Sequence, residues 1–130
     1  MTRVLALSSW VAAGHVGLSA ALPALTAAGA EAIGLPTIML SNHKAFPHCA
    51  GTPCPPGEID AMMEAIAANG WLAQLDAVLT GYMPSAAHVA AAARAAAAAP
   101  AASPGVRVVV DPILGDDPKG LYVDAAAAEA

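Results

Sequence analysis

Two kinds of apolar pattern alternate along the chain. Short apolar runs without helical spacing predict strands at residues 4–7, 30–35, 37–40, 75–79 and 106–110, with 37–40 expected at an edge. Apolar residues three and four positions apart predict helices over residues 18–28, 58–69 and 85–99. Because alternating strands and helices are typical of a parallel sheet covered by helices, the sequence predicts an α/β fold in one domain, residues 1–130.

Small or polar residues follow three of the predicted strands. Residues 8–17 are expected to form a polar turn, Thr80, Gly81 and Tyr82 close the fourth run, and Asp111 ends an apolar strand that we expect to be buried. The carboxyl ends of parallel strands share one edge of a sheet, where open α/β folds bind ligands. An aspartate followed by proline can also simply cap a turn. The convergence of three such ends favours a binding site.

Residues 41–57 are expected to form an irregular loop that is rich in proline, cysteine and histidine. Loops of this length are more often functional than decorative, so the sequence predicts a lid-like substrate loop. Imidazoles and thiolates within a dozen residues could alternatively bind zinc, through His43, His48, Cys49 and Cys54. Their spacing is not that of a common zinc module, which favours the lid.

Composition narrows the class of protein further. Of 130 residues, 58% are hydrophobic and 12% charged, which excludes a solvated disordered chain. The net charge is −5 and the five basic residues are scattered, so we expect no nucleic-acid partner. The alanine-rich stretch at residues 86–99 is too short and too polar to span a bilayer, and we expect no membrane partner. Two cysteines form no disulfide framework, which favours the cytoplasm.

Several short segments together resemble one known family, in order and over nearly the whole chain: residues 7–11, 14–17, 19–21, 40–43, 75–82, 111–116 and 119–123. They are similar to segments of the pyridoxal kinases of the ribokinase-like superfamily. The resemblance implies a three-layer α/β/α sandwich with a mainly parallel sheet, which this chain would contain incompletely. It also implies a homodimer that uses ATP and Mg²⁺ to phosphorylate the 5′-hydroxymethyl group of pyridoxal, pyridoxine or pyridoxamine, a vitamin B6 salvage reaction.

The same resemblance assigns site residues. The substrate-binding positions it implies are Ser9, Val16, His43, Lys44 and Tyr82. Asp111 and Asp116 would face the ATP phosphates and the cation, and two carboxylates in a turn suit Mg²⁺, directly or through its waters. The catalytic base and the anion hole are expected beyond residue 130, so the chain resembles the N-terminal half of such a kinase.

Some alternatives stay open. Lys44 stands where relatives have a threonine, and it could pair with an anionic substrate, form an imine with an aldehyde, or extend into solvent, which is the default for a loop lysine. A hydroxymethylpyrimidine kinase shares the chemistry and takes a different ring. A non-catalytic fragment that only binds a vitamer is the third possibility.

Overall fold

A five-stranded sheet forms the centre of the molecule. The computed structural model describes residues 1–130, and its strand order is β3-β2-β1-β4-β5. The strands are β1 (Arg3–Ala13), β2 (Glu31–Asn42), β3 (Gly51–Pro53), β4 (Ala77–Thr80) and β5 (Arg107–Val110). All neighbours are parallel except β3, which runs antiparallel to β2 at one edge. The prediction of a mainly parallel sheet is confirmed.

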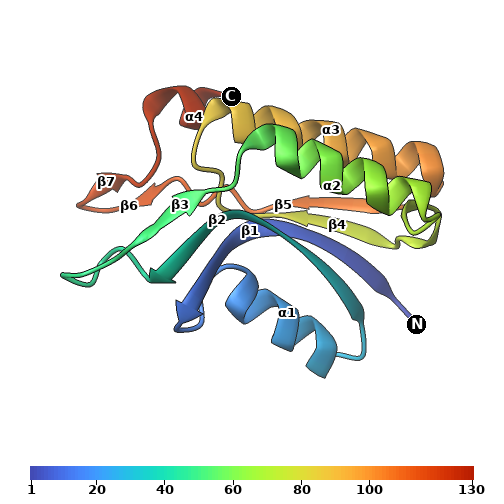
Figure 1. The fold of residues 1–130 in the computed structure, drawn as a ribbon, viewed down its shortest axis with the longest axis horizontal. Helices are drawn as coiled ribbons and strands as arrows, with labels where there is room; N and C mark the ends of the chain where they lie inside the picture. The colour runs from blue at the N-terminus through green and yellow to red at the C-terminus, as the bar shows by residue number, and fades with distance from the viewer.

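Helices cover both faces of this sheet. Helix α1 (Leu18–Ala27) lies on one face, and α2 (Pro56–Ala68) and α3 (Ala86–Ala102) lie side by side on the other (Figure 1). A 3₁₀ turn, η1 (Leu72–Gln74), leads from α2 to β4. The short elements β6 (Gly115–Asp116), β7 (Gly120–Leu121) and α4 (Ala125–Glu129) follow β5. The predicted three-layer α/β/α arrangement is therefore present.

The main core lies between the sheet and the pair α2 and α3. Its buried members are Leu5, Leu7, Leu35, Ile59, Met63, Ile66, Leu72, Leu75, Val78, Ala91, Ala92, Ala95 and Ala99. Four of the five residues that α3 buries are alanines, and their short side chains let α3 approach the strands closely. The predicted cap of α3 is also present, because the Ser85 hydroxyl accepts from the backbone N–H of His88 at 3.4 Å.

Two strands are longer than predicted. The expected turn from residue 8 is wrong, because β1 continues through Ser8 and Ser9 to Ala13. The expected break between residues 35 and 37 is also wrong, because β2 is one strand that passes through Pro36. Pro36 is tolerated there because the pairing of β1 with β2 is irregular between Ser8 and Trp10, and proline is accommodated where a ladder is interrupted.

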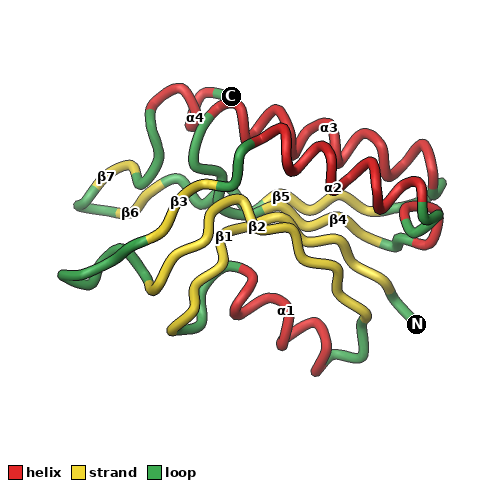
Figure 2. The backbone as a smooth tube through the Cα atoms, viewed as in Figure 1, coloured by secondary structure: helices red, strands yellow, loops and turns green.

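The loop predicted at residues 41–57 contains the edge strand. β3 pairs with residues 38–40 of β2, so the segment expected at an edge is in fact internal to the sheet. The backbone N–H of Cys54 donates to the Thr37 carbonyl at 3.0 Å, which fixes the end of the loop to β2. Residues 43–50 stay exposed and extend beyond the sheet (Figure 2).

Strand β5 is exposed rather than buried, which corrects the prediction made from its apolar run. Val108, Val109 and Val110 are 43%, 50% and 65% exposed. β5 is last in the strand order, so it has one neighbour only. An all-apolar run predicts burial on both faces only for a strand inside a sheet.

Candidate functional site

The carboxyl ends of β4 and β5 meet beside residues 7 and 8 of β1, so two of the three strand ends that were predicted to converge do so, and β1 runs on past them to Ala13. The backbone N–H of Gly81, after β4, donates to the Leu7 carbonyl of β1 at 2.8 Å. The backbone N–H of Asp111, after β5, donates to the Thr80 carbonyl at 2.9 Å. The Ser8 hydroxyl accepts from the backbone N–H of Tyr82 at 3.1 Å, so a β1 side chain fixes the start of the segment after β4.

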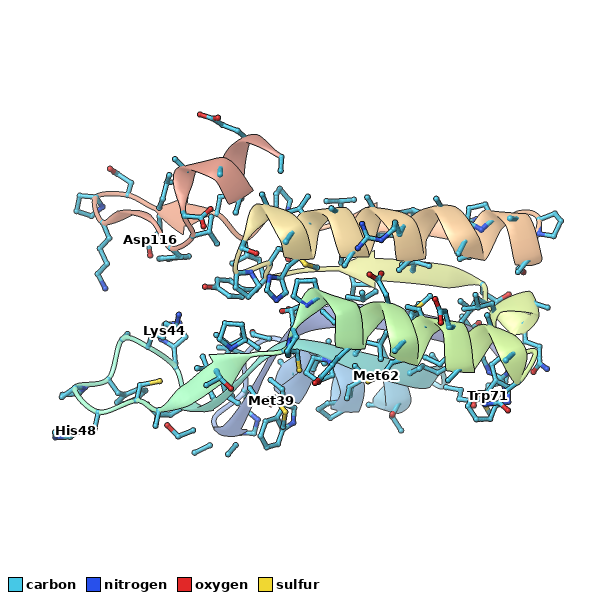
Figure 3. The ribbon with its side chains drawn as sticks, turned by 45° about the horizontal axis from the view of Figure 1, so that its top comes forward. Met39, Lys44, His48, Met62, Trp71 and Asp116 are labelled. Carbon is cyan, nitrogen blue, oxygen red and sulfur yellow. The ribbon has the colours of Figure 1, made fainter.

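A cavity of about 670 Å³ opens at this edge, and we call it the rim cavity. It is lined by Ser9, Val11, Val16, Gly17, Leu40, His43, Lys44, Ala45, Tyr82, Ile113, Asp116, Lys119 and Tyr122. All five substrate-binding positions implied by the resemblance are among these residues. Figure 3 shows Lys44 on the loop after β2 and Asp116 on the β6–β7 segment, at the same end of the molecule.

The turn from β1 into α1 forms one wall of the rim cavity. Ser9 is buried, and Gly17 approaches it so closely that a Cβ on Gly17 would lie 2.2 Å from the Ser9 carbonyl oxygen. Gly17 has a φ of 55°, which other residues rarely adopt. The Ser19 hydroxyl donates to the Val11 carbonyl at 2.6 Å and accepts from the Val11 N–H at 3.1 Å. The two hydrogen bonds tie the first turn of α1 to β1, two residues after Ser9.

Lys44 lies over Tyr82. Its ammonium nitrogen is 6.0 Å from the centroid of the Tyr82 ring, at the outer limit of a cation–π contact. The side chain is exposed and also borders the rim cavity. A molecule in the cavity would therefore meet the flat aromatic ring of Tyr82 and, beside it, the positive charge of Lys44.

The β6–β7 segment closes another side of the cavity. The backbone N–H of Tyr122 donates to the Leu114 carbonyl at 2.7 Å, and the Tyr82 hydroxyl donates to the Tyr122 carbonyl at 3.5 Å. A hydrogen bond to Asp116 raises the pKa of the Tyr122 hydroxyl, with smaller effects from desolvation and from the carboxylate charge. Sequence reasoning gave Lys119 and Tyr122 no role, although both lie within the matched segments.

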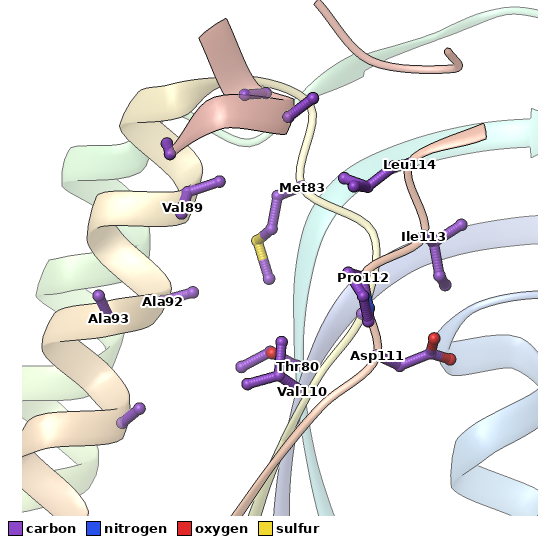
Figure 4. Close-up of a pocket in the computed structure, with 15 residues that line it drawn as sticks. Thr80, Met83, Val89, Ala92, Ala93, Val110, Asp111, Pro112, Ile113 and Leu114 are labelled. Atoms are coloured by element: carbon purple, nitrogen blue, oxygen red, sulfur yellow. The ribbon is translucent and has the colours of Figure 1, made fainter. Parts of the chain in front are cut away.

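Asp111 does not line the rim cavity. It borders a second cavity of about 270 Å³ between α3, α4 and the end of β5, which is mostly apolar. In Figure 4 the Asp111 carboxyl group points away from α3 and toward the other face of the sheet. Ile113 lines both cavities, so the two adjoin. The pair Asp111 and Asp116 is thus divided between neighbouring cavities.

The four side chains of the zinc alternative do not assemble into a metal site. No three His, Cys, Asp or Glu side chains come together in a way that could hold a metal ion. Cys49 is exposed, whereas Cys54 packs against the main core, where burial and then the Glu58 charge raise the pKa of its thiol. The Cys54 carbonyl also lies 2.7 Å from Nε2 of His88, a buried contact that ties the loop to α3.

No helix combines the length and the apolar character needed to traverse a membrane.

Comparison with known proteins points to one kind of enzyme. No family model matches the chain. It is 38% identical over 121 residues to a pyridoxal kinase of Deinococcus radiodurans, covering 93% of this chain and 41% of that protein. It is 39% identical over 127 residues to a pyridoxine/pyridoxal/pyridoxamine kinase of Bordetella avium, covering 98% and 43%. The chain therefore spans about two fifths of the length of these curated relatives.

Solved structures agree. A pyridoxal kinase of Leishmania donovani in complex with ADP and pyridoxamine superposes with a TM-score of 0.93 at 30% identity, covering 99% of this chain and 45% of that one. A provisionally named phosphomethylpyrimidine kinase of Bacteroides thetaiotaomicron gives 0.81 at 25% identity, covering 93% and 40%. The curated homologues of this chain are pyridoxal kinases, and its fold is the ribokinase-like α/β fold.

Proposed function

We propose that this chain binds a vitamin B6 vitamer in the rim cavity and takes part in its ATP-dependent phosphorylation. One observation carries the proposal: the five positions that the family resemblance assigns to substrate line a single cavity of about 670 Å³. That volume falls within the usual range for small-molecule sites. The relatives that share this fold include a kinase solved with ADP and pyridoxamine.

The lining suits a flat, polar heteroaromatic ring. Tyr82 and Val16 offer an aromatic and an apolar surface, and aromatic rings gain from offset stacking. Ser9 is the buried hydroxyl of the set and serves as the hydrogen-bond partner of the ring nitrogen. His43 and Lys44 border the same cavity from the lid-like loop of residues 41–57, so they add polar groups at the edge of the ring.

The acidic residues are proposed for the phosphate end of the reaction. Asp111 and Asp116 supply carboxylate oxygens. Proteins usually bind Mg²⁺ through one or two carboxylates together with the substrate phosphates, so these two side chains fit this ion. When bound, Mg²⁺ would neutralise phosphate charge. In the transfer, the 5′-hydroxyl oxygen bonds to the γ-phosphorus, the bond to the ADP oxygen breaks, and the hydroxyl proton passes to a base.

The base and the anion hole are proposed to come from beyond residue 130. General-base and anion-hole groups each contribute orders of magnitude to rate. We therefore expect the 130-residue chain alone to bind vitamers weakly and to transfer phosphate very slowly. By the same resemblance we propose a homodimer and a cytoplasmic location, where the free thiols of Cys49 and Cys54 stay reduced.

Calorimetric titration with pyridoxal tests the binding step. Tyr82→Ala should weaken binding about tenfold, because it removes the stacking surface and the neighbour of Lys44. Trp71→Ala is the matched aromatic truncation, since Trp71 is 46% exposed and lies at the other end of the molecule (Figure 3), and it should leave binding unchanged. Absence of pyridoxal binding at millimolar concentration, or equal effects of both variants, would refute the proposal.

A hydroxymethylpyrimidine kinase is the second candidate, favoured by the structural similarity to the Bacteroides thetaiotaomicron protein. The same titration with hydroxymethylpyrimidine separates the two, because the tighter ligand identifies the ring. Adding Mg·ATP and following phosphorylated product by chromatography distinguishes both kinases from a fragment that only binds a vitamer.

A further inference from the structure

A bulge in β2 lies directly opposite Ser9. The pairing of β1 with β2 shifts between Ser8 and Trp10, so that two residues of β2, Thr37 and Ile38, stand opposite the single residue Ser9. Both Thr37 and Ile38 are buried, although successive side chains of a regular strand face opposite sides of a sheet. Bulges are frequent next to active sites, where they redirect a side chain. This bulge borders the rim cavity, because Ser9 lines it.

The bulge changes which residues of β2 are buried. Burial falls on residues 35 and 37 before it and on residues 38 and 40 after it. Ile38 and Leu40 form a small buried cluster with Val11, and the Tyr82 side chain packs against this cluster. A strand without the bulge would keep its alternation, which would turn Ile38 and Leu40 to the opposite side. The bulge therefore supplies the apolar support of Tyr82.

Thr37 holds the backbone of Tyr82. The Thr37 hydroxyl donates to the Tyr82 carbonyl at 2.6 Å, and the Thr37 side chain is completely buried. The backbone N–H of Tyr82 donates to the Ser8 hydroxyl, so side chains of two different strands bond the two backbone polar groups of this residue. The segment between β4 and α3 is irregular. These two side-chain bonds therefore fix Tyr82 where no sheet ladder does.

A second path joins Thr37 to the other end of the same segment. The Thr37 carbonyl accepts from the backbone N–H of Cys54 at 3.0 Å. The Cys54 carbonyl lies 2.7 Å from Nε2 of His88, and Nδ1 of the same ring lies 2.7 Å from the Ser85 hydroxyl. Because a carbonyl can only accept, Nε2 donates to it, and Nδ1 of the neutral ring accepts from Ser85. Thr37 is thus connected to both ends of residues 82–85 and, through Cys54, to the lid-like loop.

We propose that Thr37 is a positioning residue for the rim cavity. The bulge directs its hydroxyl to the Tyr82 carbonyl, and this bond holds the Tyr82 ring in the place where it faces a vitamer. The path through His88 keeps the same segment and the end of the lid-like loop together. The inference rests on the proposed function, because it takes Tyr82 as a wall of the vitamer site. Its first test uses no vitamer, so the two proposals can fail separately.

Fluorine NMR tests the position of Tyr82 directly. In a chain carrying Tyr122→Phe, Tyr82 is the sole tyrosine, so incorporated 3-fluorotyrosine reports on this ring alone. Thr37→Val keeps the shape of the side chain and should shift or split the signal, because the Tyr82 carbonyl loses its donor. Thr37→Ser retains the hydroxyl and should restore the signal. Thr26→Val is the matched control, since the Thr26 hydroxyl also donates to a backbone carbonyl, that of Leu22 in α1, and it should change nothing.

Pyridoxal titration tests the consequence for binding. Thr37→Val should weaken binding about fivefold to tenfold, and Thr37→Ser should bind as the wild type does. In a Tyr82→Ala background, Thr37→Val should have no further effect, because a residue that acts only through Tyr82 is fully coupled to it. A general loss of stability would instead weaken binding in both backgrounds. Circular dichroism checks that each variant folds.

His88 provides a second pair of variants, which serves equally if Thr37→Val does not fold. His88→Leu removes the contact with the Cys54 carbonyl and should also change the fluorine signal of Tyr82. His88→Gln keeps an amide N–H that can donate to the same carbonyl, and it should restore the signal.

Two results would overturn the proposal. An unchanged fluorine signal in folded Thr37→Val, or in folded His88→Leu, would show that these contacts do not position Tyr82. An equal loss of pyridoxal affinity from Thr37→Val with and without Tyr82→Ala would show that Thr37 acts elsewhere. If no variant and no wild-type sample binds pyridoxal, the proposed function fails, and the fluorine spectra alone decide the positioning role.

Discussion

Replacing Gly17 by alanine tests the tightest contact behind the rim cavity. Gly17 has φ 55° and ψ −135°, a conformation that costs a non-glycine residue about 1–3 kcal/mol. Its new Cβ would lie 2.2 Å from the Ser9 carbonyl oxygen and 2.3 Å from the Ser9 hydroxyl. Relieving an overlap of this kind typically costs a further 1–3 kcal/mol or so. We therefore expect Gly17→Ala to lower the free energy of unfolding by about 4 kcal/mol.

Gly29→Ala is the matched control. Gly29 also has a positive φ, 82°, but nothing lies within 4 Å of the position that its Cβ would take, so only the backbone cost of about 1–2 kcal/mol applies. Urea unfolding followed by circular dichroism measures the free energy of unfolding of both variants. With a slope of about 2 kcal/mol per molar urea, the midpoint should fall by about 2 M in Gly17→Ala and by less than about 1 M in Gly29→Ala. Equal losses in the two variants would refute the close packing of Gly17 against Ser9.

Other features give sharper chemical tests. Iodoacetamide should alkylate exposed Cys49 well before Cys54, whose raised pKa and burial keep it a thiol; equal rates would contradict this placement. Asp116→Asn should return the raised Tyr122 pKa toward 10.0, measured by absorbance with the other tyrosine replaced by phenylalanine. The stabilisation from that contact is complete below the unfolded-state pKa and is lost as the pH rises through the folded value. Leu5→Ala, at a fully buried position, should cost about 2–5 kcal/mol in urea unfolding, and a loss under about 1 kcal/mol would contradict the core.

Helices were easier to predict than strand ends, for a physical reason. Helical periodicity is local, so α1, α2 and α3 begin and end within a few residues of the predicted ranges. The continuation of β1 beyond Leu7 depends instead on distant partners. Ser8 is stable inside a strand because its hydroxyl accepts from the backbone of Tyr82, 74 residues away in sequence. No pattern confined to residues 4–13 contains that information.

Some site residues could likewise be predicted from the sequence pattern, and others could not. Tyr82 follows from topology, because it comes just after the end of β4, and Ser9 lies beside it because β1 runs on past the last residue that pairs with β4, Leu7. His43 and Lys44 lie in an exposed loop, where neither periodicity nor burial marks a residue, and only the family resemblance indicated them. Tyr122 was missed because its link to Asp116 crosses a short hairpin, β6–β7, which contains too few residues to show strand alternation.

The two aspartates show why spacing alone was insufficient. Asp111 and Asp116 are five residues apart, and a simple turn would bring both carboxylates to one ion. In the structure Asp111 still belongs to the end of β5, through its N–H bond to Thr80, whereas Asp116 already pairs with Gly120 across the β6–β7 hairpin. The chain between them changes direction, and Ile113 separates the cavities that they border. A cation held by both carboxylates, as proposed above, would therefore have to lie where the two cavities adjoin, beside Ile113.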